Sequence, residues 1–207
     1  MATGNGQAAV ALAGHFERVL ATDASPSQLR HAEPHSRVTY RVAVAGHDAD
    51  PPRDVDLVTV AQALHWLDRP RLFEEARGAL RPRGLLAVWT YALCRIDEAV
   101  DAVVRRLHHE LLRGWWTPDR AMVDEGYRSI EFPFRELHPP AIAMTSRWDL
   151  ARFRGYLDTW SAVRRFQRER GRDPLEEIGP ALEDAWGEPT QVREVTWPLT
   201  MRVGVRD

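Results

Sequence analysis

The sequence predicts an α/β protein built around a parallel sheet. Short apolar runs alternate with helical patterns through roughly the first ninety residues, which is the order expected of βαβ units. A glycine-containing loop precedes the first helical pattern, and an acidic residue closes the first strand pattern. Longer amphipathic patterns then follow until a last strand pattern near the C-terminus. We expect a single domain over 1–207, with a cofactor-binding half at 1–95 and a substrate-side half at 96–207.

The elements of the first half follow from capping residues and from the spacing of apolar residues. Ser25-Pro26-Ser27-Gln28 combines a capping box with proline in the first helical turn, and Asp68 can cap a later helix. Strands are expected at 18–22, 38–44, 55–60 and 85–91. Helices are expected at 7–13, at 26–33 and from Asp68 to about Leu80.

The second half is expected to be mainly helical. Apolar residues at helical spacing mark one helix, through Ile96, Val100, Val103, Leu107 and Leu111. Further helices are expected at 150–166 and from Pro174 to about Trp186, with strands ending near Met144 and running over 192–205. Seven of the eight tryptophans follow residue 80, where an α/β enzyme could build a lid or a substrate wall.

Composition indicates a folded soluble domain and excludes several partners. Hydrophobic residues make up 44% and charged residues 28% of the 207, and the formal net charge of −2 gives no reason to expect nucleic acid or a membrane as partner. Cys94 is the single cysteine, so an internal disulfide is impossible and a cytoplasmic location is expected. No metal is expected either, because Pro34 breaks the helical spacing between His31 and His35. The oligomeric state stays open.

The N-terminal loop and one carboxylate suggest an adenosine-containing cofactor. Gly4 and Gly6 allow a sharp turn and a close approach of the backbone to a ligand. Asp23 ends the next strand, where a carboxylate can accept hydrogen bonds from both ribose hydroxyls. The spacing Gly4-x-Gly6-x-x-Ala9 also fits the fingerprint of nicotinamide enzymes. A nicotinamide-dependent oxidoreductase is therefore an alternative at this point.

Two longer segments carry a more specific resemblance. The segment AQALHWLD at 61–68 and the segment GYLDTWSA at 155–162 resemble class I S-adenosylmethionine-dependent methyltransferases, and are most similar to the group related to fungal trans-aconitate and cantharidin methyltransferases. Shorter matches occur at 125–128, 132–134 and 197–199. The resemblance implies a Rossmann-like methyltransferase sheet with a helical elaboration before the last strand, S-adenosyl-L-methionine as cofactor and a small molecule as methyl acceptor.

The resemblance also implies which residues bind the cofactor. Asp23 would hold the ribose hydroxyls, and relatives usually carry an acidic residue at the position of Gly46. The implied cofactor-binding residues are Thr3, Gly4, Asn5, Gly6, Asp23, Ala24, Ala45, Gly46, His47, Ala61 and Gln62.

The acceptor side is expected to use aromatic residues and one base. His65 is the candidate catalytic base if the acceptor is a hydroxyl or an amine, although it could instead cap a helix or pack on Trp66. Trp66 would face the methyl group or the substrate. If the acceptor is a carboxylate, Arg128 is the candidate to hold it. Tyr156 and Trp160, four residues apart on one expected helix, would wall the pocket, with burial of Trp160 in the core as the alternative.

One departure from the resembled family concerns the centre of the sheet. The family has a strand before the glycine loop, which ends in an acidic residue and lies between the strands expected here at 18–22 and 55–60. Met1 stands where that strand should be ending, so we expect a sheet that lacks its first, central strand and a misplaced start codon. An inactive truncated methyltransferase is therefore a further alternative to a working enzyme.

Overall fold

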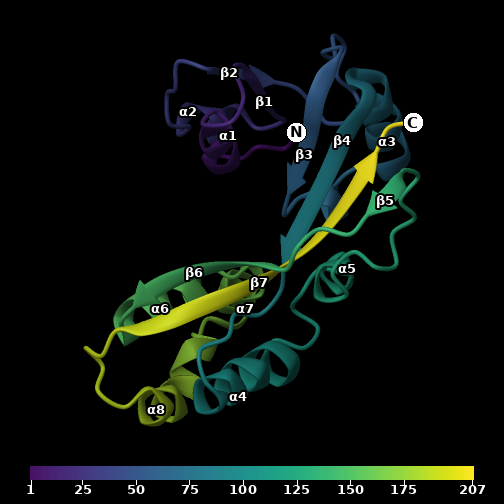
Figure 1. Cartoon of the computed structure of the whole chain (residues 1–207). Helices are drawn as coiled ribbons and strands as arrows, with labels where there is room; N and C mark the ends of the chain where they lie inside the picture. Colours follow the sequence, from purple (N-terminus) through teal and green to yellow (C-terminus); the bar gives the residue numbers. More distant parts are fainter. The chain divides into compact units, whose positions relative to one another are not determined.

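A computed structural model describes all 207 residues and divides into two compact units (Figure 1). The first unit comprises residues 1–90, 126–140 and 200–207, and the second comprises residues 91–125 and 141–199. No helix in the structure combines the length and the apolar character needed to cross a membrane.

The first unit alternates strands with short helices. Its elements are α1 (Gln7–Leu12), β1 (Val19–Asp23), α2 (Pro26–Arg30), β2 (Val38–Val42), β3 (Val55–Ala61), the 3-10 helix η1 (Leu64–Trp66), α3 (Arg69–Ala79), most of β4 (Leu80–Tyr91), β5 (Arg135–Leu137) and the C-terminal part of β7 (Arg193–Val205). This order confirms the α/β class.

The second unit is mainly helical. Its elements are α4 (Glu98–Arg106), the π-helical turn η2 (Leu107–Leu111), α5 (Arg120–Asp124), β6 (Ile142–Trp148), α6 (Leu150–Asp158), α7 (Ser161–Arg170), α8 (Pro174–Trp186) and the first part of β7. Five of its helical segments precede β7, together with η2, so the predicted helical elaboration before the last strand is confirmed.

The strands of the first unit form two separate sheets. β1 pairs in parallel with β2, from Val19 opposite Val38 to Asp23 opposite Val42. The second sheet has the order β3-β4-β7-β5, in which β3 and β4 are parallel and β5 is antiparallel to β7. β1 pairs with no strand but β2, and β3 with no strand but β4. The sheet is therefore interrupted where the sequence predicts a lacking central strand.

The first residues of the chain hydrogen-bond to both interrupted edges. The amino group of Met1 donates to the carbonyl of Thr59 in β3, at 2.9 Å. The backbone N–H of Thr3 donates to the carbonyl of Thr22 in β1, also at 2.9 Å. These two bonds satisfy one carbonyl on each edge.

Side-chain caps fix the starts of the helices. Ser25 Oγ accepts a hydrogen bond from the N–H of Gln28, and Asp68 Oδ1 accepts one from the N–H of Arg71, as the sequence predicts. In the second unit, the same role is played by Asp97, Asp149 and Asp173. Each cap satisfies one of the N–H groups that a helix start otherwise leaves unpaired.

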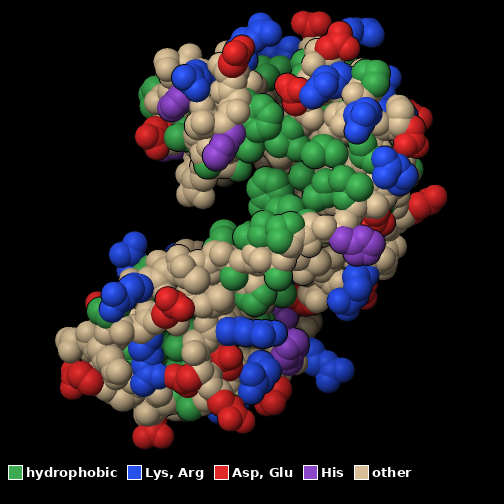
Figure 2. Space-filling view, in the orientation of Figure 1, with side chains coloured by type: hydrophobic (Ala, Val, Ile, Leu, Met, Phe, Trp, Pro, Cys, Tyr) green, Lys and Arg blue, Asp and Glu red, His purple; other side chains and the backbone are tan.

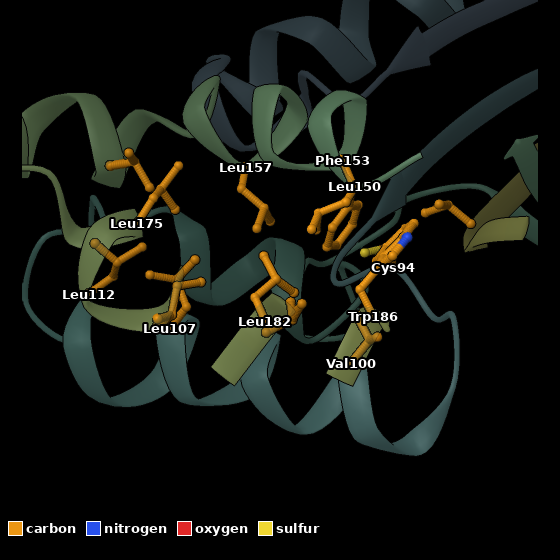
Figure 3. Packing of buried hydrophobic residues seen from close by; sticks show 14 of the residues in the cluster. Cys94, Val100, Leu107, Leu112, Leu150, Phe153, Leu157, Leu175, Leu182 and Trp186 are labelled. Carbon is orange, nitrogen blue, oxygen red and sulfur yellow. The ribbon is translucent and has the colours of Figure 1, made fainter. Parts of the chain in front are cut away.

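The core of the second unit is formed by facing sides of its helices and β7 (Figure 3). Phe153 of α6 stacks on Trp186 of α8, with ring centres 5.3 Å apart and an interplanar angle of 26°. Both side chains are fully buried. The same cluster contains aliphatic residues, among which Figure 3 labels Val100, Leu107, Leu112, Leu150, Leu157, Leu175 and Leu182.

Three expected elements differ most from the sequence prediction, and the helix expected at 26–33 is also shorter, because it ends at Arg30. The helix expected at 150–166 is two helices, α6 and α7, because the chain turns at 159–160, where Thr159 Oγ1 donates to the carbonyl of Tyr156 at 2.6 Å. The strand expected to end at Met144 is two strands, β5 and β6, on either side of the proline pair at 139–140. The strand expected at 85–91 starts earlier, because β4 begins at Leu80. Residues 83 and 84 extend this strand through backbone hydrogen bonds with Arg206.

One polar side chain is enclosed in the second unit. His108 lies in η2, is 3% exposed, and packs its ring 4.6 Å from that of Trp116. Burial lowers the pKa of His108 from 6.5 to about 4, against the opposing influence of Asp124. The ring is therefore neutral near pH 7.

Acidification should destabilise the second unit through His108. The pKa of this ring falls from 6.5 to about 4 on folding. The contribution of the neutral ring to the free energy of unfolding is therefore complete above pH 6.5 and is lost as the pH falls towards 4. The shift corresponds to about 3 kcal/mol of unfolding free energy. Urea unfolding near neutral pH and near pH 4, followed by tryptophan fluorescence, measures the loss, since six of the eight tryptophans lie in this unit.

The variant His108→Phe isolates this contribution from the titration of the carboxylates. Its ring cannot be protonated, so its stability should fall by less than that of the natural chain over the same range. Equal losses in the two proteins would contradict the assignment.

Candidate functional site

The glycine loop and Asp23 lie together, as the sequence predicts. The N–H of Gly4 donates to Asp23 Oδ2 at 2.7 Å, and the N–H of Ser25 donates to Asp23 Oδ1 at 2.8 Å. A further bond, from the N–H of Gly6 to the carbonyl of Thr3 at 3.0 Å, closes the loop itself. The carboxylate at the end of β1 therefore holds the loop in place.

The backbone of the loop requires glycine. Gly4 has φ +58° and Gly6 has φ +85°, a region that side chains with a Cβ disfavour. A Cβ at Gly6 would also lie 2.4 Å from the hydroxyl of Tyr40 in β2. Tyr40 is held there by donating to the carbonyl of Glu33 at 2.9 Å. The role of this tyrosine could not be recognised from the sequence, because the contact depends on how β2 packs against the loop.

The loop after β2 packs against α3. Gly46 has φ +82°, and a Cβ there would lie 2.9 Å from the backbone nitrogen of Leu72. Its neighbour Ala45 is buried, and His47 is exposed with Nδ1 2.9 Å from an Arg71 guanidinium nitrogen. Packing on α3 thus explains the glycine at 46 without an adenine contact, and the predicted contact stays a prediction.

Gln62 is fixed at the carboxyl end of β3. It has φ +51°, an unusual conformation for a residue other than glycine. Its N–H donates to the carbonyl of Trp89 at 2.8 Å, and its Oε1 accepts from Thr90 Oγ1 at 2.6 Å. In open α/β sheets, ligands bind outside the carboxyl ends of the strands, where Ala61 and Gln62 lie. The contribution of Thr90 could not be recognised from its position in a strand.

His65 is buried and paired with a tyrosine distant in the sequence. Its Nδ1 lies 2.9 Å from the hydroxyl of Tyr127, and the two side chains are 8% and 1% exposed. Tyr127 has φ +61°, and its carbonyl accepts from an Arg202 guanidinium nitrogen at 2.9 Å. The ring of Trp66 lies 4.6 Å from that of His65 and is 59% exposed. From the sequence, Tyr127 could be recognised only as part of a family-like segment, and its pairing with His65 could not be predicted.

The remaining candidates for the acceptor side lie apart in the chain. Arg128 is exposed in the first unit, whereas Tyr156 and Trp160 belong to the second. The rings of Tyr156 and Trp160 meet edge to face at 5.9 Å, although Trp160 lies beyond the end of α6. The predicted wall that combines these two residues with His65 stays a prediction.

Tyr156 and Trp160 are also packed against the core of the second unit. The hydroxyl of Tyr156 accepts from Trp197 Nε1 at 2.9 Å, and burial raises the pKa of Tyr156 to about 12. Trp160 contacts the ring of Trp116 at 5.6 Å. These contacts agree with the alternative in which Trp160 packs in the core.

Comparisons with known proteins identify the family. A family model described as a methyltransferase domain matches residues 1–88. A protein of Dictyostelium discoideum assigned to the methyltransferases is 34% identical over 186 residues, which cover 88% of this chain and 71% of that protein. The chain belongs to the methyltransferase family.

A solved structure extends the likeness to nearly the whole chain. The structure, of a protein from Anaeromyxobacter dehalogenans assigned as a type II methyltransferase, is 48% identical, with a TM-score of 0.92. The match covers 99% of this chain and 87% of that one. Methyltransferase cfoB of Aspergillus candidus is 35% identical over 126 residues, and the match covers 53% of this chain and 37% of cfoB. The Rossmann-like methyltransferase fold is thereby confirmed.

Removing the hydroxyl of Tyr127 should weaken the first unit. Tyr127→Phe keeps the buried ring but deletes the hydrogen bond to His65, which should lower the unfolding free energy by about 1–3 kcal/mol because both groups are buried. Chemical denaturation followed by the fluorescence of Trp66 and Trp89, with the other tryptophans replaced, reports on this unit.

Tyr40→Phe is the matched control. Its hydroxyl bonds an exposed carbonyl, so its loss should cost less. Equal stability of Tyr127→Phe and the natural chain would show that the hydroxyl of Tyr127 contributes nothing to holding His65.

Proposed function

We propose that this protein transfers a methyl group from S-adenosyl-L-methionine to a small-molecule acceptor. The observation that carries the proposal is the carboxylate of Asp23, held against the glycine loop at the end of β1. Membership of the methyltransferase family supports the reaction type. When bound, the cofactor supplies a methyl group on a sulfonium, and the protein chiefly has to bind and orient the two reactants.

The bonding of Asp23 leaves capacity for a ribose. Each of its two oxygens accepts one backbone N–H, and a carboxylate oxygen can accept two hydrogen bonds. One acceptor position therefore remains on each oxygen, which matches the two hydroxyls of an adenosine ribose. Glycines at 4 and 6 allow the backbone to approach the ligand closely. The remaining residues proposed to contact the cofactor are Thr3, Asn5, Ala24, Ala45, His47, Ala61 and Gln62.

A nicotinamide-dependent oxidoreductase would share the glycine loop and the carboxylate of Asp23. It would not explain why the rest of the chain is similar to a methyltransferase. The solved methyltransferase structure matches 99% of this chain. Calorimetric titration with S-adenosylhomocysteine and with NAD separates the two functions. Binding of NAD alone would overturn the proposed cofactor.

Replacing Asp23 should weaken cofactor binding. Asp23→Ala removes two charge-assisted bonds to the ribose, each worth roughly 1.5–3 kcal/mol, so the dissociation constant for S-adenosylhomocysteine should rise at least about tenfold. Asp56→Ala is the control, because Asp56 pairs with Arg81 on the surface at 2.7 Å. Melting temperatures of both variants show whether the fold is kept. An unchanged dissociation constant in folded Asp23→Ala would show that Asp23 does not bind the ribose.

The acceptor decides whether His65 has a chemical role. A carboxylate acceptor, as the resemblance to the trans-aconitate group suggests, is already ionised near neutral pH and needs no base. A hydroxyl or an amine acceptor would need one, and His65 is the proposed base, with its Nδ1 oriented by Tyr127. Arg128 and Trp66 are proposed to contact the acceptor, together with Tyr156 and Trp160.

A further strand between β1 and β3 is part of the proposed working enzyme. Both strands have an edge with no strand partner, and parallel sheets are normally buried on both faces. One face of the β3–β4 pair contains Leu57, Leu85 and Trp89, which are only half-buried. Figure 2 shows hydrophobic side chains gathered over β3 and β4. A strand in this position would pair both edges, and segments joined to it could cover that face.

Extending the chain tests this strand. The codons before Met1 should encode an apolar run that ends in Asp or Glu, and a form that includes them should melt at a higher temperature and bind S-adenosylhomocysteine more tightly than the 207-residue form. The two lengths are compared side by side with and without this ligand. If the shorter form melts cooperatively and gains as much from the ligand as the longer form, the strand is not required.

A further inference from the structure

A strained turn in the first unit presents the tyrosine that pairs with His65. Gly126 and Tyr127 have φ +63° and +61°, so two consecutive residues adopt the left-handed conformation. A Cβ at Gly126 would lie 2.7 Å from Cγ2 of Thr200 in β7, which shows how closely the turn packs on this strand. A residue other than glycine keeps this conformation only where its surroundings enforce it. The backbone of Tyr127 therefore requires a group that holds it.

Arg202 of β7 is that group. Its Nη1 donates to the carbonyls of Tyr127 and Ile130, at 2.9 and 2.5 Å. Its Nε and Nη2 donate to the two carboxylate oxygens of Glu136 in β5, at 3.0 and 2.6 Å. The guanidinium carbon also lies 4.6 Å from the ring centre of Phe132. Because a guanidinium that binds a carboxylate with two parallel bonds has a fixed orientation, Arg202 ties the turn to both strands.

The chemistry of the two side chains decides which of them donates. The hydroxyl of Tyr127 and Nδ1 of His65 lie 2.9 Å apart, and both side chains are buried. A phenol O–H is more acidic than an imidazole N–H, and an unprotonated imidazole nitrogen is more basic than a phenol oxygen. The hydrogen bond is therefore strongest when Tyr127 donates to Nδ1. A neutral ring that accepts at Nδ1 carries its proton on Nε2.

We propose that Arg202 is a positioning residue, which acts through Tyr127 to fix His65 in the tautomer with its proton on Nε2. The consequence for methyl transfer rests on the proposed function. In this tautomer Nδ1 is engaged by the hydroxyl, and Nε2 can donate a hydrogen bond but cannot take up a proton. His65 is thus a hydrogen-bond donor and not a base. Of the two kinds of acceptor considered above, the one that is already ionised fits this arrangement.

The ¹⁵N resonances of the His65 ring report the tautomer directly. Spectra of the whole chain are recorded at pH 8, where imidazole rings are ordinarily neutral, and the two resonances are assigned by their loss in His65→Gln. We expect Nδ1 to resonate as an unprotonated nitrogen and Nε2 as a protonated one. A proton on Nδ1, on both nitrogens, or exchanging between them overturns the proposal.

Two variants test whether Arg202 acts through Tyr127. Tyr127→Phe deletes the hydroxyl, and Arg202→Lys leaves a single ammonium that cannot bridge the turn and Glu136 in the same way. Both should move the Nδ1 resonance of His65 in the same direction, towards that of a ring that exchanges between its tautomers. A shift in Tyr127→Phe without a shift in Arg202→Lys would show that Arg202 does not position the hydroxyl, and would overturn its assignment.

Arg135→Gln is the matched control. Arg135 is an exposed residue of β5 that pairs with Asp207 at 3.5 Å, so its loss should leave both resonances of His65 unchanged. An equal shift in this variant would indicate a general effect of lost charge and would overturn the assignment of Arg202.

Glu136→Gln replaces Arg202→Lys if that variant does not fold. Glu136 is 45% exposed, and the substitution keeps its shape while it removes the charge that orients the guanidinium. The Nδ1 resonance should then shift in the same direction by a smaller amount, and an unchanged resonance overturns the role of Arg202. Calorimetric titration with S-adenosylhomocysteine tests the proposed function separately. Absent binding would contradict the proposed cofactor, whereas the resonances of His65 decide its tautomer whether or not the cofactor binds.

Discussion

The glycine loop of the proposed cofactor site depends on the two hydrogen bonds that the Asp23 carboxylate accepts from the backbone. One comes from Gly4 and the other from Ser25, at 2.7 and 2.8 Å, so a single side chain ties the loop, the end of β1 and the start of α2 to one point. Bonds from N–H groups to a carboxylate are stronger than those between neutral groups. The loop consequently has one preferred arrangement, which would lower the entropic cost of the proposed cofactor binding.

Two of the five non-glycine residues of the first unit that have positive φ also orient polar side chains. Gln62 and Tyr127 both have positive φ, and each makes a side-chain hydrogen bond, to Thr90 and to His65 respectively. Such conformations cost on the order of 1–3 kcal/mol each and persist only where the surroundings enforce them. At Tyr127 the enforcing group is Arg202, whose guanidinium binds the carbonyl of this residue. Strain placed in this way fits a site in which side-chain direction matters.

Local features of the fold could be predicted from the sequence because local chemistry determines them. The caps at Ser25 and Asp68 lie where a side chain can reach the backbone two or three residues on, and strand patterns show in a few consecutive residues. The loop and Asp23 could be paired because a single helix separates them. The bond between His65 and Tyr127 spans 62 residues and depends on tertiary packing, which no pattern in one sequence encodes.

The difference between what a local pattern shows and what it does not show also explains why the helix expected at 150–166 is two helices. Apolar residues at helical spacing continue through the segment, but Thr159 bonds to the carbonyl of Tyr156, and Trp160 becomes the cap of α7. A hydroxyl that bonds to a carbonyl of the preceding turn competes with the backbone hydrogen bonds of a continuing helix. The spacing of apolar residues does not reveal this competition. The new orientation lets Trp160 meet Trp116 and His108, contacts that one straight helix was not expected to make.

The tryptophans and His108 of the second unit require different explanations. Trp186 is fully buried and Trp197 nearly so, and burial of such rings contributes to stability without any ligand. The imidazole of His108 packs against two other tryptophans, Trp116 and Trp160, and an unpaired buried polar atom such as its Nε2 costs about 1–3 kcal/mol. An apolar ring in its place would fill the space without this cost. Packing therefore accounts for the tryptophans, whereas the imidazole of His108 also makes a polar contact that an apolar ring could not make, from its Nδ1 to Nδ1 of His109 at 3.2 Å.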